Sequence, residues 1–137
     1  MMLIDTAVDR LKLEEGFRRL PYMDSQGVET VGYGFAIREG FTQEEADGIL
    51  ELRVKVLIEK VRLSYNPWFD GLTEGRQSVI ISLCYNVGMD GARKFENFWH
   101  AVAQGAYNMA ATELLNSLAA KQAPARYRGM AETMRRG

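Results

Sequence analysis

Apolar residues recur at helical spacing over most of the chain, and one short stretch near the N-terminus instead alternates as a β-strand does. The helical spacing predicts helices near residues 6–15, 42–61, 73–87, 94–104 and 108–118, and a last helix that begins at Pro124. Between the first two helices, the turn sequence Asp24-Ser25-Gln26-Gly27 precedes a β-rich run. The pattern therefore predicts an α+β protein, mostly α, with a small sheet of two or three strands.

Capping residues refine the ends of the first two helices. Asp5 or Thr6 can cap the first helix, and Gly16 suits its C-terminal end because glycine tolerates positive φ. Thr42 and Glu45 form a capping box at the start of the second helix. At near twenty residues that helix would span about 30 Å, which is long enough to join two lobes.

The strongest apolar run in the chain is VIISLCYNV, at residues 79–87. It is apolar on nearly every side of a helix, which predicts a helix buried in the centre of a helical lobe, capped by Thr73 and ended by Gly88. The loop before it carries Trp68 and Phe69. Sugar stacking and core packing are both open for these two aromatic side chains, and core packing is favoured.

Composition narrows the possible functions. The 137 residues carry a net charge of −1. A chain that binds nucleic acid would be more basic, so we expect no nucleic-acid partner. The single cysteine, Cys84, excludes an internal disulfide and is expected to be a small buried residue. The single histidine, His100, leaves no metal-ligand set and no Ser-His-Asp triad. We expect no metal and no cofactor.

The sequence also bears on where the protein acts. No segment approaches the roughly 20 apolar residues of a membrane span, so no stable membrane insertion is expected. The N-terminus is acidic as well as apolar and shows no signal-peptide pattern.

Three groups with hydrolytic potential lie where predicted elements meet. Glu15 falls in the last turn of the first helix, where the helix dipole disfavours a carboxylate by a few tenths of a kcal/mol. Asp24 opens the turn of the hairpin, and Thr30 lies in the returning strand. A helix end and a rigid hairpin can hold two carboxyl groups at a fixed separation, as acid-catalysed hydrolysis of a glycosidic bond requires.

These residues carry a family resemblance. The pattern Glu15-Gly16, Tyr22-x-Asp24, Gly27-x-x-Thr30-x-Gly32-x-Gly34 resembles the phage-type lysozymes of glycoside hydrolase family 24, which include the T-even phage lysozyme and many prophage endolysins. Further similarity lies in Pro67-Trp68-Phe69, Asn86-Val87-Gly88, Lys94-Phe95 and Gln122-x-Pro124-x-Arg126.

The resemblance implies a role for each matching residue. Glu15 matches the catalytic acid, Asp24 the second carboxylate, and Thr30 the hydroxyl that helps to hold the attacking water. Arg126 matches the arginine that pairs with the catalytic glutamate. The residues expected to contact substrate are Tyr33, Phe35, Tyr85, Asn86 and Gln122.

The resemblance also implies an architecture. A single lysozyme-like domain would cover residues 1–137, with a β lobe at about 16–40 and a linking helix at about 42–62. A helical lobe would follow at about 64–137, with the first helix packed on it and a cleft between the two lobes.

The implied activity is that of a muramidase. It would cleave the β-1,4 bond between N-acetylmuramic acid and N-acetylglucosamine in bacterial peptidoglycan, with inversion, during phage-driven lysis of the host. The resemblance implies a monomer that stays in the host cytoplasm until a holin lets it reach the cell wall.

Other functions remain open at this point. Phe35 and Ala119 depart from the family pattern, which motivates a catalytically weak or inactive domain that binds peptidoglycan or another protein. Chitin-type hydrolysis and a lytic transglycosylase are related enzyme outcomes. A helical DNA-binding module is supported only by the arginine-rich C-terminus.

Overall fold

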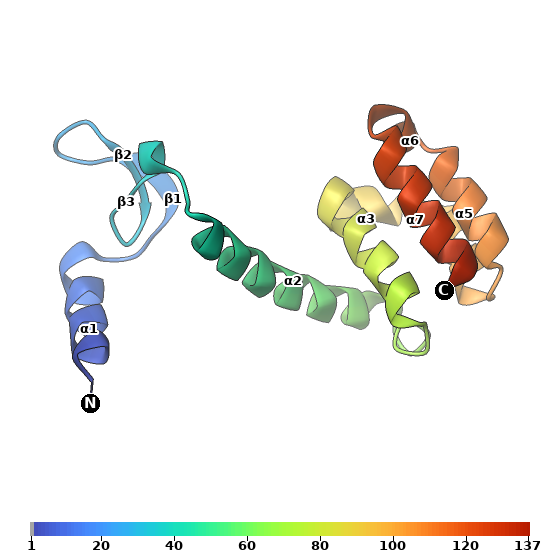
Figure 1. Ribbon diagram of the computed structural model, residues 1–137, viewed down its shortest axis with the longest axis horizontal. Helices are drawn as coiled ribbons and strands as arrows, with labels where there is room; N and C mark the ends of the chain where they lie inside the picture. The colour runs from blue at the N-terminus through green and yellow to red at the C-terminus, as the bar shows by residue number, and fades with distance from the viewer. Residues whose placement is uncertain (1) are drawn as a thin grey trace. The chain divides into compact units, whose positions relative to one another are not determined.

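The computed structural model describes residues 2–137, and their contacts divide between Gly48 and Ile49 into two compact units. We call residues up to Gly48 the N-terminal unit and Ile49–Gly137 the helical unit. The predicted fold class is confirmed: the elements are mostly helical, with one small antiparallel sheet in the N-terminal unit (Figure 1). None of the helices within residues 2–137 has the length and apolar character to span a membrane.

The N-terminal unit begins with helix α1 (Leu3–Glu15), three residues earlier than the capping pattern predicts. Met2 occupies the N-cap position, and its backbone N–H donates to a carboxylate oxygen of Asp5 at 3.2 Å. Asp5 therefore closes the first turn from inside the helix, and neither it nor Thr6 is the cap. Gly16 follows the helix with a positive φ of 71°, as predicted.

Three strands and one short 3-10 helix complete the structure up to Gly40. Strands β1 (Arg18–Met23), β2 (Glu29–Gly32) and β3 (Phe35–Ala36) form an antiparallel sheet in that order, and η1 (Ile37–Glu39) follows. Thr30 pairs with Tyr22 on one side and with Ala36 on the other. Thr30 thus lies at the centre of the sheet.

Helix α2 (Gln43–Tyr65) is the longest helix and ends four residues beyond the predicted position. Its capping box is confirmed, because the Thr42 N–H donates to Glu45 at 2.9 Å and the Glu45 N–H donates to the Thr42 hydroxyl at 3.1 Å. Its buried residue is Val61. The division between the two units falls within this helix.

The helical unit packs five further helices around one core. They are α3 (Glu74–Arg93), α4 (Glu96–Ala103), α5 (Tyr107–Leu115), α6 (Leu118–Gln122) and α7 (Pro124–Arg136), and α7 lies beside α5 and α3 (Figure 1). The predicted buried helix supplies the centre of this core. The large side chains that are fully buried in this core come mainly from these five helices: Ile80, Leu83, Phe98, Leu114, Tyr127 and Met134. Phe69 and Val61 join them from other parts of the chain.

Three predicted boundaries in this unit are wrong. Gly88 bends α3, with φ 79° and ψ 163°, but helical structure resumes after it through Arg93. Asn108 lies inside α5, which starts after Ala106. The helix predicted at 108–118 ends at Leu115, and the separate helix α6 follows, where the Ser117 hydroxyl accepts a bond from Ala120 N–H at 3.1 Å and caps the new helix.

The aromatic loop before α3 packs as expected. Phe69 is only 2% exposed, and Trp68 packs against the core beside Tyr65 and Trp99. The ring of Tyr65 stacks on that of Trp99 with centroids 4.0 Å apart. Core packing is therefore the role of these two loop aromatics.

Candidate functional site

Glu15 is the last residue of α1, and its carboxylate lies against the turn between β2 and β3. A β-carbon placed on Gly34 would be 2.5 Å from Oε2 of Glu15 and 3.0 Å from its carboxyl carbon. Such distances are too short for real atoms, so the carboxylate occupies the space that any side chain at position 34 would need. Glu15 remains exposed to solvent.

Asp24 is built into the hairpin turn by its own carboxylate. Its Oδ1 accepts backbone N–H bonds from Gln26 at 2.8 Å and from Val28 at 2.9 Å. Its backbone N–H donates to the Val28 carbonyl at 2.9 Å. Both side-chain bonds fall on Oδ1, so Oδ2 is the oxygen that is left for water or substrate.

Thr30 is 4% exposed, and its hydroxyl donates to the carbonyl of Val28 at 2.8 Å. The backbone of Val28 therefore holds both Asp24 and Thr30, and it fixes one relative to the other. Because the hydroxyl proton is already donated, the oxygen of Thr30 can meet a water only as an acceptor. This refines the role that the resemblance gives to Thr30.

Tyr33 and Phe35 belong to a row of aromatic rings in the N-terminal unit. The ring of Tyr33 lies 5.7 Å from that of Phe17 and 6.5 Å from that of Phe35. Tyr33 is half-buried in this row, whereas Phe35 is 56% exposed. Of the two predicted substrate contacts, Phe35 offers the more accessible surface.

The remaining predicted residues lie in the helical unit. Tyr85 and Asn86 are exposed on α3, and Arg126 lies in the first turn of α7. The Arg126 guanidinium donates to the Ser82 carbonyl and hydroxyl, both at 3.2 Å. The Tyr127 hydroxyl donates to Oδ1 of Asn86 at 2.8 Å. Two consecutive residues of α7 thus hold two residues of α3 that are one helical turn apart.

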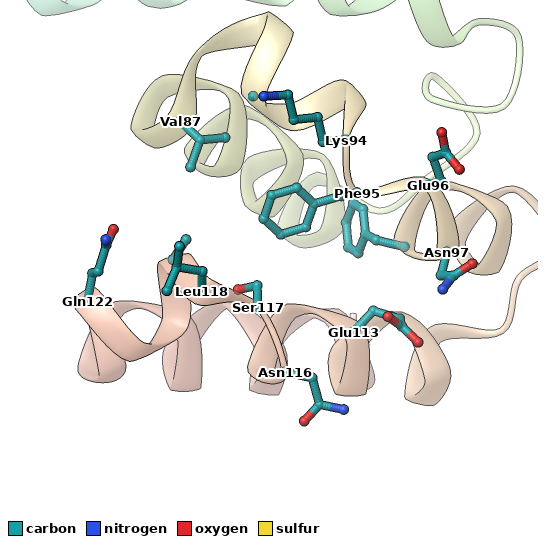
Figure 2. Close-up of a pocket in the computed structure, with 13 residues that line it drawn as sticks. Val87, Lys94, Phe95, Glu96, Asn97, Glu113, Asn116, Ser117, Leu118 and Gln122 are labelled. Carbon is teal, nitrogen blue, oxygen red and sulfur yellow. The ribbon is translucent and has the colours of Figure 1, made fainter.

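Gln122 lies in the wall of a pocket of about 510 Å³ within the helical unit. Figure 2 shows the side chains of Leu118 and Gln122, from α6, on one side of this pocket and Val87, from α3, on the other, with Phe95 also in the lining. The lining mixes apolar and polar groups, as a site for a saccharide or peptide does. The pocket is also lined by Gly91, Lys94, Glu96, Asn97, Phe98, Glu113, Asn116, Ser117 and Ala119.

The charge of the protein is divided unevenly between the two units. The sequence up to Gly48 has ten acidic and five basic residues, whereas Ile49–Gly137 has eight acidic and twelve basic ones. The net charge of −1 therefore conceals a basic helical unit. An excess of positive charge favours an anionic polymer as the partner of this unit.

The described residues include no candidate metal centre. Within residues 2–137, no three side chains of histidine, cysteine, aspartate or glutamate come close enough to hold an ion together. Burial raises the pKa of the Cys84 thiol to about 11, so this cysteine is a neutral core residue at neutral pH.

Sequence reasoning missed two of these relationships. Gly34 belongs to the family pattern, but nothing in the sequence indicates that Glu15 rests against it. Nothing in the local pattern around Tyr127 distinguishes it from an ordinary core tyrosine. The one sequence signal that could have pointed to Tyr127 is its position directly after Arg126, a residue of the family pattern.

Comparison with known proteins agrees with these observations. A family model described as "Phage lysozyme" matches residues 12–136, which include Glu15, Asp24, Thr30 and Arg126. This match covers nearly the whole chain and both units. The chain therefore belongs to the phage lysozyme family, a family of glycoside hydrolases that act on peptidoglycan.

Proposed function

We propose that this protein is a muramidase that hydrolyses the β-1,4 bond between N-acetylmuramic acid and N-acetylglucosamine by an inverting mechanism. The observation that carries the proposal is the arrangement of Glu15, Asp24 and Thr30 within one unit of a family member. Glu15 is exposed and its carboxylate lies against Gly34, while Asp24 and Thr30 share the Val28 backbone.

In this mechanism Glu15 gives its proton to the glycosidic oxygen as the bond to the anomeric carbon breaks. A water molecule attacks that carbon from the opposite face and passes its proton to Asp24. Thr30 accepts a hydrogen bond from the same water and helps to orient it. The bonds that Asp24 receives from Gln26 and Val28 support this role, because they leave Oδ2 for the water.

The helical unit supplies three of the five substrate-binding residues in this proposal, and Tyr33 and Phe35 belong to the N-terminal unit. Tyr85, Asn86 and Gln122 would contact the glycan, and the pocket beside Gln122 has room for a substituent of it. The excess of basic residues in this unit suits anionic peptidoglycan.

Arg126 is included as a supporting residue, as the resemblance implies. Its exposed guanidinium is already held by Ser82, so it is preorganised for an anionic group. Arg126→Gln should reduce hydrolysis by about tenfold or more. Arg128→Gln, which removes an exposed arginine on the same helix, is the matched control and should retain activity. Equal activity in both variants would remove Arg126 from the site.

The activity is tested with purified protein and a peptidoglycan suspension. The wild type should clear the suspension and release new reducing ends, and Glu15→Gln should abolish both without changing the circular dichroism spectrum. Glu14→Gln is the control, because Glu14 is exposed on the same helix and pairs with Arg10 at its surface. Proton NMR of the first products should show the α-anomer. Full activity in Glu15→Gln would exclude Glu15 as the catalytic acid.

A second candidate function is a binding domain with little or no turnover. It is favoured by Ala119, which lines the pocket without offering an aromatic face to a sugar. This domain would retain peptidoglycan in a pull-down assay but release no reducing ends after long incubation. Any release that depends on Glu15 excludes it.

We propose an endolysin role for the enzyme, acting as a monomer that depends on a holin for access to the wall. Bacteria that express it should keep growing until their inner membrane is permeabilised, and should then lyse. Lysis without permeabilisation would show that the protein reaches the wall by another route. Sedimentation at micromolar concentration should give a single species of about 15.5 kDa.

A further inference from the structure

Tyr127 is a fully buried tyrosine whose hydroxyl reaches an exposed side chain. It is 0% exposed, and its hydroxyl donates to Oδ1 of Asn86 at 2.8 Å. Asn86 lies 41 residues earlier, on α3. The bond therefore links the core of the helical unit to a surface residue.

The surroundings of this bond make its geometry well defined. The ring of Tyr127 belongs to the core, so it cannot move without disturbing its neighbours. The preceding residue, Arg126, holds Ser82 one turn earlier on α3. Two residues after Asn86, Gly88 takes a non-helical conformation. Helix α7 thus clamps α3 just before the point at which α3 bends.

The chemistry of the carboxamide gives this bond a direction. An asparagine side chain has one oxygen that accepts and one amino group that donates two hydrogen bonds. In the structure Tyr127 donates to the oxygen and so fixes which end faces the core, which leaves both N–H groups of the amino end for a ligand. Without Tyr127, the carboxamide could turn over and present either end.

We propose that Tyr127 is a positioning residue that turns the carboxamide of Asn86 so that its amino group donates to an oxygen of the bound saccharide. This rests on the proposed function, which places Asn86 among the glycan-binding residues. An acetamido carbonyl or a ring hydroxyl is a suitable acceptor. Burial raises the pKa of Tyr127, so its hydroxyl stays a donor into the alkaline range.

The test is Tyr127→Phe, which removes the hydroxyl and keeps the ring in the core. We expect KM for peptidoglycan to rise about fivefold with kcat unchanged, the change that loss of one hydrogen bond predicts. Tyr107→Phe, another tyrosine of the helical unit, is the control and should leave KM unchanged.

A double-mutant cycle separates positioning from general damage to the fold. If Tyr127 acts through Asn86, Tyr127→Phe should add nothing to the loss caused by Asn86→Ala. Additive losses would overturn the proposal. So would a wild-type KM in Tyr127→Phe.

A binding measurement keeps this test independent of turnover. The Glu15→Gln protein, with and without Tyr127→Phe, is titrated with the tetramer of N-acetylglucosamine while the side-chain amide signals of Asn86 are followed by NMR. Weaker binding by about fivefold in the double variant supports the positioning role even if the wild type releases no reducing ends, in which case only the proposed activity fails. Equal binding in both proteins, or binding in neither, overturns it.

Discussion

The carboxylate of Glu15 lies against the α-carbon of Gly34, so that a β-carbon at position 34 would be 2.5 Å from Oε2. Gly34 also has a positive φ of 77°, which L-residues with a side chain rarely adopt. Glycine is thus required here twice, once by the turn and once by the neighbouring acid. The turn between β2 and β3 thus leaves room for the last side chain of α1.

Gly34→Ala should therefore impair activity more than stability. The positive φ costs about 1–2 kcal/mol of folding free energy, and the new methyl group must also displace the Glu15 carboxylate. A shift of about 1 Å in a catalytic group can lower the rate by about 100-fold. Hydrolysis assays and urea unfolding on the same protein measure the two effects.

Gly40→Ala is the matched control for this substitution. Gly40 has a positive φ of 63°, and a β-carbon there meets nothing within 4 Å. It should lose stability to a similar extent and keep its activity. If the two alanine variants lose activity equally, the contact between Gly34 and Glu15 has no catalytic meaning.

Substitutions of Asp24 should separate its two roles. Asn at this position can still accept both turn bonds from Gln26 and Val28, so Asp24→Asn should unfold at a similar urea concentration. It cannot take a proton from water, so hydrolysis should fall by about 100-fold or more. Asp24→Ala should lose the same activity and also about 1–3 kcal/mol of stability. An active Asp24→Asn enzyme would contradict the proposed role of Asp24 as the base.

The parts of the fold that sequence patterns predicted are those determined by neighbouring residues. The Thr42–Glu45 capping box and the Asp24 turn each depend on groups a few residues apart, and both are present in the structure. The bond from Tyr127 to Asn86 joins two helices. No local periodicity encodes it, since it depends on how α7 packs on α3.

Boundaries failed where a side chain competed with the helix backbone. Ser117 accepts the Ala120 N–H and donates to the Leu114 carbonyl at 2.7 Å, which ends one helix and starts the next. The apolar spacing continues through this point, so periodicity alone extends the first of these helices to Leu118. The family pattern names the candidate site residues, but the contact of Glu15 with Gly34 depends on how the turn between β2 and β3 meets the end of α1.

Arg76 should be the arginine on which the stability of the helical unit most depends. Its guanidinium donates to the carbonyls of Met134 at 2.9 Å and Arg135 at 3.0 Å, and it lies 3.5 Å from the ring centroid of Tyr107. It therefore binds the last carbonyls of α7, which have no partner within the helix. Arg76→Ala should lower the free energy of unfolding by about 2–3 kcal/mol.

Arg136→Ala provides the comparison for Arg76→Ala. Arg136 pairs with Glu132 on the same helix, and both side chains are exposed to solvent. Such pairs contribute at most about 0.5 kcal/mol. Urea unfolding followed by tryptophan fluorescence compares the two, and equal losses would show that Arg76 does not hold the end of α7.

Cys84 should make the stability of the protein fall at alkaline pH. Burial raises the pKa of its thiol from 9.0 to about 11, so between these values the folded chain holds a proton that the unfolded chain has lost. Unfolding then releases a proton, and the free energy of unfolding decreases as pH rises through this window. Below pH 9 the thiol is neutral in both states and contributes no pH dependence. Urea unfolding between pH 8 and 10.5 should show a smaller decrease for Cys84→Ala than for the wild type, and other titrating groups cancel in the comparison. Parallel curves, or native-state labelling of the thiol by a disulfide reagent as fast as in urea, would show that Cys84 is open to solvent.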